Sequence, residues 1–116
     1  MSIQPHPADI TAQRIADISD WVDTSDVNIH RDPEALGWHR VAKVAEESGE
    51  AINAWLLYTG GNPRKPAGPL SDVIDELLDV ALAALGGVEH LTGNAGTALE
   101  LLYRKAEQVK ERAVGA

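Results

Sequence analysis

The chain carries two pairs of carboxylates, and the members of each pair are three residues apart. Glu47 and Glu50 form the first pair, and Glu76 and Asp79 form the second. Residues at this spacing are neighbours on one face of a helix, with Cβ atoms roughly 5–6 Å apart. If the two helices lie side by side, four carboxylates converge and raise one another's pKa values unless a cation neutralises them. Mg²⁺ and Mn²⁺ prefer oxygen ligands, so the pattern predicts a divalent-cation site.

The same spacing is also typical of an ordinary solvated helix face. Asp72, Glu76 and Asp79 lie on one side of a helical wheel, opposite a stripe of Leu, Val and Ile. A site is favoured because a second segment repeats the acidic spacing and because its acids lie beside an apolar stripe. Aromatic and imidazole side chains in that segment could form the wall of a pocket for a flat ring: Trp38, His39, Trp55 and Tyr58. Each Trp could equally belong to the core.

Apolar periodicity predicts four helices and no strand. Hydrophobic residues recur at helical spacing at about 8–22, 33–59, 70–92 and 94–114. Asp32 and Pro33 have the residue types of an N-cap and a first helical position, and Asn94 is the expected N-cap of the last helix. Gly86 and Gly87 interrupt the third segment, but Leu91 continues its period. The sequence therefore predicts an all-α protein, an antiparallel bundle of about four helices.

The length of 116 residues fits one domain. Residues 1–7 are predicted to be a flexible N-terminal tail and residues 8–116 a single helical domain. Residues 60–69 hold three Gly and three Pro, which excludes a helix there. This loop either closes over the site with Arg64 and Lys65 or only connects two helices. Phe is absent, so the core should be aliphatic, with a stripe on the second helix that contains Trp38, Val41, Val44, Ala45, Ile52, Trp55 and Leu56.

Composition excludes several classes of function. The formal net charge of −8 argues against a nucleic-acid backbone or an anionic membrane as the main partner. Cys is absent, so disulfides and thiolate metal sites are excluded, and the four His show no zinc-binding spacing. No signal peptide or membrane-spanning run is apparent. We expect a soluble, cytoplasmic protein.

The two acidic motifs resemble those of a known family. Residues 43–51, KVAEESGEA, contain the pattern EExxE, and residues 75–80, DELLDV, contain ExxD. In this order, with a variable spacer between them, they resemble the signature of the MazG-type all-α nucleoside triphosphate pyrophosphohydrolases. The resemblance covers the second and third helices, and more loosely the last, where Lys105, Val109 and Arg112 resemble a basic stretch of the family. The first helix adds little to it.

The resemblance implies a role for individual residues. Glu47, Glu50, Glu76 and Asp79 would be the Mg²⁺ ligands, for which Mn²⁺ could substitute. Glu46 and Glu47 would be the catalytic acids, with Glu46 orienting or deprotonating the attacking water. Phosphate-binding residues would be Lys43, Lys105 and Arg112, the last two across a subunit boundary. Solvated surface pairing is the competing interpretation of all three cations. Base-binding residues would be Trp38, His39 and Trp55, although relatives often carry Asn where His39 stands.

The resemblance implies a Mg²⁺-dependent enzyme that cleaves a ribo- or deoxyribonucleoside triphosphate to the monophosphate and pyrophosphate, with cleansing of the nucleotide pool as one role. Metal ions bridging carboxylates and phosphates would neutralise charge on the leaving group. A related enzyme acting on another phosphorylated metabolite is one alternative. The other is a catalytically weak helical interaction or assembly module with an acidic metal-binding face. Since helices this apolar cannot cover their own stripes, we also expect a homodimer or homotetramer.

Overall fold

The computed structural model describes residues 4–115 as four α-helices joined by turns and loops, without a β-strand in that range. The helices are α1 (Pro7–Thr24), α2 (Pro33–Tyr58), α3 (Leu70–Leu91) and α4 (Ala98–Val114). The all-α prediction is therefore confirmed. Pro7 already belongs to α1, and residues 1–3 of the predicted tail lie outside the described residues.

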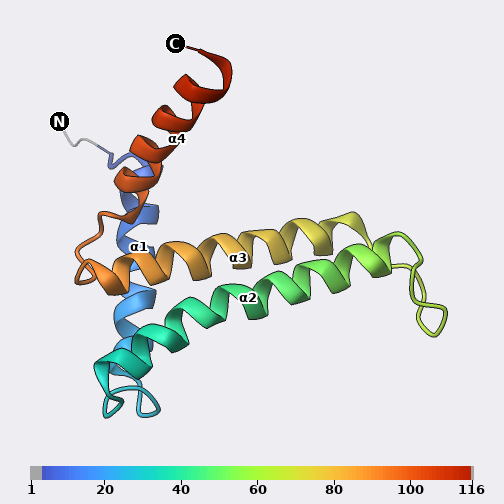
Figure 1. The fold of residues 1–116 in the computed structure, drawn as a ribbon, viewed down its shortest axis with the longest axis horizontal. Coiled ribbons are helices and arrows are strands. Elements are labelled where there is room, and N and C mark those ends of the chain that lie inside the picture. Colours follow the sequence, from blue (N-terminus) through green and yellow to red (C-terminus); the bar gives the residue numbers. More distant parts are fainter. Residues whose placement is uncertain (1–3, 116) are drawn as a thin grey trace.

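Helices α2 and α3 form a long antiparallel hairpin that organises the molecule (Figure 1). Asp32 caps α2 as its residue type predicts, because its carboxylate accepts hydrogen bonds from the backbone N–H groups of Glu34 and Ala35 at 3.1 and 3.2 Å. The Gly- and Pro-rich segment 60–69 closes the far end of the hairpin without helix. The hairpin therefore places the EExxE and ExxD motifs on adjacent helices.

Helix α1 crosses the hairpin near the end at which α3 finishes (Figure 1). Helix α3 continues through Gly86 and Gly87, and both glycines are buried at this crossing. A Cβ atom at Gly86 would lie 3.2 Å from Nη2 of Arg40, so the missing side chain leaves room for the guanidinium. Close packing against Arg40 therefore accounts for Gly86, in spite of the low helix propensity of glycine.

Helix α4 begins three residues later than the Asn94 cap would require, so that prediction is wrong. Asn94 has a φ of 57° in the turn before the helix, and Thr97 occupies the N-cap position. The cap is supplied from α3 instead. The two carboxylate oxygens of Glu89, which is fully buried, accept hydrogen bonds from the N–H groups of Gly96 and Ala98, each at 2.8 Å. A buried carboxylate beside a helix N-terminus is stabilised by these donors and by the helix dipole.

The core inside one chain is small and aliphatic. Buried apolar residues lie mainly where α1 crosses the hairpin and along the contact of α2 with α3: Ile15, Ala16, Leu36, Ala51, Ala54, Val73 and Ala98. Much of the stripe predicted for the core of α2 is exposed instead, including Trp38 at 70% and Ile52 at 63%. Helical periodicity identified this stripe correctly, but no second layer of the same chain covers it. Among the described residues, no helix has the length and apolar character to cross a membrane.

Candidate functional site

Three of the four predicted carboxylate ligands converge on one side of the hairpin. Glu47 and Glu50 of α2 and Glu76 of α3 each offer an oxygen, and these atoms all lie within 4.8 Å of one another. We call these three residues the carboxylate cluster. The i, i+3 spacing aligns the two acids of α2, and the antiparallel pairing brings the acid of α3 to them. Oxygen atoms at this separation could coordinate one hard divalent cation.

Glu76 is the most perturbed member of the carboxylate cluster. Its Oε2 atom is buried and has no hydrogen-bond partner. Burial raises the pKa of Glu76 above its ordinary value, and the negative charges of Glu50, Asp79 and Glu47 raise it further. A cation bound here would supply both the missing partner and the missing positive charge. The residues present therefore fit a divalent metal.

Asp79 lies beside the carboxylate cluster but outside the set of converging oxygens. It lies one turn after Glu76 on α3, and it lines a pocket together with Glu47. Its charge contributes to the raised pKa of Glu76, so the two carboxylates interact. Asp79 is therefore placed where it could face a ligand that enters the pocket.

The pocket next to the carboxylate cluster has a volume of about 380 Å³ and opens to solvent. Its apolar wall consists of Ile15, Ile18 and Val22 of α1 with Leu82 of α3. The facing wall comes from α2 and carries His39, Lys43 and Glu47. An apolar wall with acidic groups at one edge is suited to a flat ring attached to a charged, metal-bound group. Helix α1, which adds little to the sequence motif, therefore contributes directly to this pocket.

Lys43 forms ion pairs with two neighbouring acids of α2, Glu46 and Glu47. Its Nζ lies 3.1 Å from Oε1 of Glu46 and 3.4 Å from Oε1 of Glu47. The hydrogen bond to Glu46 and the interaction with Glu47 raise the pKa of Lys43. Glu46 is 60% exposed and lies outside the carboxylate cluster, whereas Glu47 is only 15% exposed. The structure thus shows Lys43 paired with neighbouring acids on its own helix.

A second, more acidic hollow of about 300 Å³ lies on the other side of the carboxylate cluster. It is lined by acids that include Glu50, Asp72 and Glu76, and the loop at the end of the hairpin contributes Gly68. Arg64 and Lys65 are not among its lining residues. The loop therefore closes the hairpin without placing its cations at the carboxylates.

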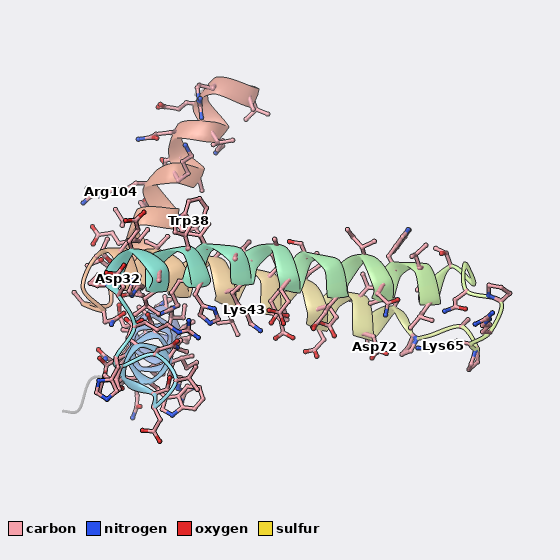
Figure 2. All side chains as sticks on the ribbon, turned by 60° about the horizontal axis from the view of Figure 1, so that its bottom comes forward. Asp32, Trp38, Lys43, Lys65, Asp72 and Arg104 are labelled. Carbon is pink, nitrogen blue, oxygen red and sulfur yellow. The ribbon has the colours of Figure 1, made fainter. Side chains whose placement is uncertain are left out.

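Four predicted site residues lie away from the carboxylate cluster. In Figure 2, Trp38 projects from the side of α2 opposite to Lys43, toward the side on which α4 lies. Trp55 lines an apolar hollow with residues such as Val73 and Leu77, and its ring packs against Tyr58 at a centroid distance of 5.5 Å. Lys105 and Arg112 belong to α4, which leaves the hairpin and extends away from it (Figure 1). Within one chain, only His39 of the predicted base-binding residues lines the pocket beside the acids.

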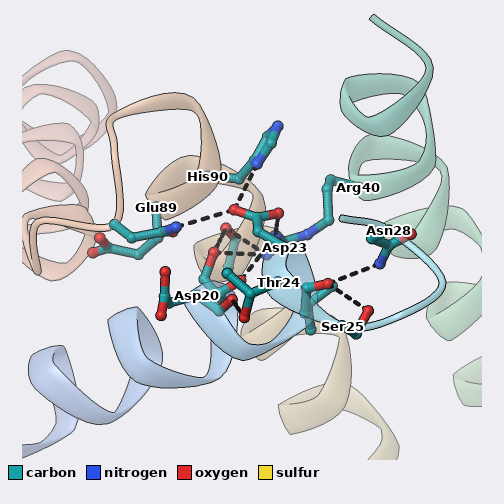
Figure 3. A network of polar contacts seen from close by, with 12 residues as sticks. Asp20, Asp23, Thr24, Ser25, Asn28, Arg40, Glu89 and His90 are labelled. Atoms are coloured by element: carbon teal, nitrogen blue, oxygen red, sulfur yellow. Dashed lines mark hydrogen bonds and ion pairs between the residues drawn. The ribbon is translucent and has the colours of Figure 1, made fainter. Parts of the chain in front are cut away.

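A second charged cluster, which the motifs did not indicate, lies where α1 crosses the hairpin (Figure 3). Arg40 is 7% exposed, and its guanidinium Nη1 lies 2.6 Å from Oδ1 of Asp23. Its Nη2 donates to Oγ of Ser19 and to the carbonyl oxygen of Gly86, each at 2.9 Å. A single side chain of α2 therefore ties α1 to α3.

The other oxygen of Asp23 is also paired. Its Oδ2 lies 2.9 Å from Nδ1 of His90 and accepts a hydrogen bond from Nδ2 of Asn94 at 3.0 Å. Burial alone would raise the pKa of Asp23, but hydrogen bonds from His90 and Asn94 and the charge of Arg40 together lower it below its ordinary value. We call Ser19, Asp23, Arg40, Gly86, His90 and Asn94 the anchor network. Because the first and last of these residues are 75 positions apart, no local spacing in the sequence could have identified the network.

Comparison with known proteins adds no relative. No model of a known protein family matches the chain, and no curated protein or solved structure matches it either.

Proposed function

We propose that this protein is a Mg²⁺-dependent nucleoside triphosphate pyrophosphohydrolase, which releases a nucleoside monophosphate and pyrophosphate. The observation that carries the proposal is the carboxylate cluster, in which Glu76 has a buried, unpartnered oxygen and a raised pKa. Such a group is costly in the free protein and is compensated when a cation binds. The two motifs that supply these residues, EExxE and ExxD, give the activity its class by resemblance.

In this proposal the pocket binds the nucleobase, and the carboxylate cluster lies next to the triphosphate. The nucleobase lies against the apolar wall of α1, where Ile18 and Val22 exclude water and His39 offers a hydrogen-bonding edge. The triphosphate extends toward Glu47 and Asp79 at the edge of the pocket. The position of Trp38 and Trp55 on the other side of the hairpin excludes them from this arrangement, so His39 is the base-contacting candidate of the three.

The roles of the acids follow from their positions. Glu47, Glu50 and Glu76, with Asp79 beside them, would hold the cation, which when bound would neutralise phosphate charge and lower the pKa of the attacking water. Glu46 is outside the cluster and holds Lys43, so it acts on the site by positioning. Of the two cations that line the pocket, Arg40 is bonded within the anchor network, so Lys43, which contacts Glu47, is the candidate for binding the incoming phosphates.

A panel of ribo- and deoxyribonucleoside triphosphates, incubated with the protein and Mg²⁺, tests the proposal. Monophosphate and pyrophosphate should appear in equal amounts, and EDTA should abolish both. Glu76→Gln should reduce turnover by about 100-fold or more, since one ligand charge is lost while the shape is kept. Glu107→Gln, on the exposed surface of α4, is the matched control and should retain full turnover.

Absence of pyrophosphate with every base, in Mg²⁺ and in Mn²⁺, would refute the proposal. Isothermal titration with Mg²⁺ alone then separates the two remaining explanations. Binding of Mg²⁺ that Glu76→Gln removes would indicate a metal site for a narrower substrate or for assembly. Lack of Mg²⁺ binding would make the acids an ordinary solvated helix face.

A further inference from the structure

The three acids of the carboxylate cluster differ in whether a cation of the chain lies close to them. Glu47 has one, because Nζ of Lys43 lies 3.4 Å from its Oε1 atom. Among the described residues, no Lys, Arg or His forms an ion pair with Glu50 or Glu76. Lys43 is therefore the countercharge of the cluster in the metal-free protein, and it compensates one acid of the three.

The two acids that hold Lys43 differ in their relation to the cluster. Glu46 accepts a hydrogen bond from Nζ at 3.1 Å, is 60% exposed and lies outside the converging oxygens. Glu47 makes the longer contact, is 15% exposed and supplies one of the converging oxygens. A cation bound by the cluster would therefore compete with Lys43 for Glu47, but it would leave Glu46 to the lysine.

Lys43 is able to change partners over a short distance. Its ammonium group has three N–H donors on a flexible stem, so it can keep one acceptor while it exchanges another. Its side chain is 44% exposed and lines the pocket beside the cluster. Because ion pairs in contact with water contribute little to stability, breaking the contact with Glu47 costs little. The hydrogen bond with Glu46 keeps Lys43 at the edge of the pocket after that contact is broken.

We propose that Lys43 is an exchangeable countercharge, which neutralises Glu47 in the metal-free protein and turns to the phosphates when a divalent cation replaces it. Glu46 is the positioning residue that retains Lys43 at the pocket during the exchange. The inference rests on the proposed function for the identity of the anion. It makes binding of the metal and of the triphosphate cooperative, since each ligand releases the group that the other needs.

Calorimetric titration of the metal-free protein with Mg²⁺ alone gives the first test. Lys43→Met removes the competing charge and should lower the dissociation constant of Mg²⁺ by about 5-fold. Lys110→Met is the matched control, because it removes the same charge from an exposed position of α4, which extends away from the hairpin (Figure 1). This control should leave the dissociation constant unchanged, since salt screens distant surface charges. Circular dichroism checks that both variants keep their helices.

The titration separates failure of this inference from failure of the proposed function. If Lys43→Met binds Mg²⁺ with an unchanged or higher dissociation constant, the lysine does not compete for Glu47, and the inference is overturned while the metal site stands. If neither the parent protein nor Lys43→Met binds Mg²⁺, the metal site itself is refuted, and both proposals fail with it.

Glu46→Gln tests the positioning role through a double-mutant cycle. In the parent background, the substitution leaves Glu47 as the charged partner of Lys43 and should raise the dissociation constant of Mg²⁺ by about 5-fold. In the Lys43→Met background, the same substitution should change it by less than about 2-fold, because no lysine is left to redirect. Equal effects in both backgrounds would show that Glu46 acts on the metal directly, which would overturn its role through Lys43.

Steady-state kinetics with the best nucleotide of the panel test the release of Lys43 to the phosphates. Lys43→Met should raise KM by about 10-fold, because a charge-assisted hydrogen bond to phosphate is lost, although the same variant binds Mg²⁺ more tightly. A structural defect would weaken binding of both ligands, so the opposite signs identify the exchange. Tighter Mg²⁺ binding with an unchanged KM would overturn it. The calorimetric tests need no substrate, and they decide the competition at Glu47 even if no nucleotide is cleaved.

Discussion

The hairpin of α2 and α3 carries two charged clusters that differ in how far their charges are compensated. In the anchor network, Asp23 has partners on both oxygens, and Arg40 is bonded to three different residues. In the carboxylate cluster, three acids of one sign face each other, and an oxygen of Glu76 is buried without a partner. The first cluster is complete within one chain and stabilises it. The second is incomplete, which is what a binding site for a cation requires.

The largest effect should follow from removing the central cation of the anchor network. Arg40→Met leaves Asp23 partly buried without its countercharge and removes one of the donors to the carbonyl of Gly86. We expect the free energy of unfolding to fall by about 3–5 kcal/mol, measured by urea denaturation. The control is Arg104→Met, which breaks an exposed pair with Glu100 and should change stability by less than about 0.5 kcal/mol. Equal effects of the two substitutions would show that the anchor network is not a stabilising element.

Neutralising one acid in each cluster should have opposite effects on stability. Asp23→Asn keeps the shape but weakens the contacts with Arg40 and His90, and should cost about 1–3 kcal/mol. Glu76→Gln removes one charge from a set of repelling charges and should raise the melting temperature in EDTA. Mg²⁺ should then raise the melting temperature of the parent protein more than that of Glu76→Gln. A lower melting temperature of Glu76→Gln in EDTA would contradict the inference that repulsion among the carboxylates destabilises the metal-free protein.

The two clusters should also differ in how the free energy of unfolding depends on pH, although this effect should be smaller than those of the substitutions above. Asp23 has a folded pKa below its ordinary value of 3.8, so its stabilisation is complete above that pH and is lost as the pH falls through the folded pKa. Glu76 has a folded pKa above its ordinary value of 4.5, so it opposes folding increasingly as the pH rises from 4.5 through the folded pKa. In EDTA, Glu76→Gln should flatten the stability curve at and above pH 4.5, and Asp23→Asn below pH 3.8. The reverse assignment would show that the pKa shifts have been given the wrong direction.

Local sequence rules were sufficient to predict the helices and most of the carboxylates that converge. The period of Leu, Val and Ile predicted four helices, and Asp32 with Pro33 predicted the start of α2. The spacing of Glu47 and Glu50 required them to share a helix face, and the structure adds Glu76 to them. These features depend on residues within one or two turns of each other, for which helical geometry leaves little freedom.

Features that depend on distant residues were missed. The predicted Asn94 cap was wrong because Glu89, buried in the last turn of α3, accepts hydrogen bonds from the N-terminus of α4, and Asn94 donates to Asp23 instead. The apolar pattern of α1 was recognised, but periodicity cannot say that Ile18 and Val22 face a pocket beside the acids of another helix. Trp38 and Trp55 were predicted to belong either to a base pocket or to the core. In the structure Trp38 projects from the side of α2 opposite to Lys43 (Figure 2), and Trp55 lines an apolar hollow away from the acids.

The sequence by itself determined that the protein is helical, that its acids occur at i, i+3 spacing on two helices and that its helices carry more apolar surface than one chain can bury. Helical periodicity and side-chain chemistry are local properties, so the order of residues is enough to define them. Only the tertiary structure decided which face of each helix meets which neighbour. It left one buried oxygen of Glu76 without a hydrogen-bond partner, whereas Arg40 is bonded to Asp23, Ser19 and Gly86. It also directed α4 away from the hairpin. The physical reason is that burial and charge compensation are set by contacts between helices, and such contacts depend on the packing of the whole chain.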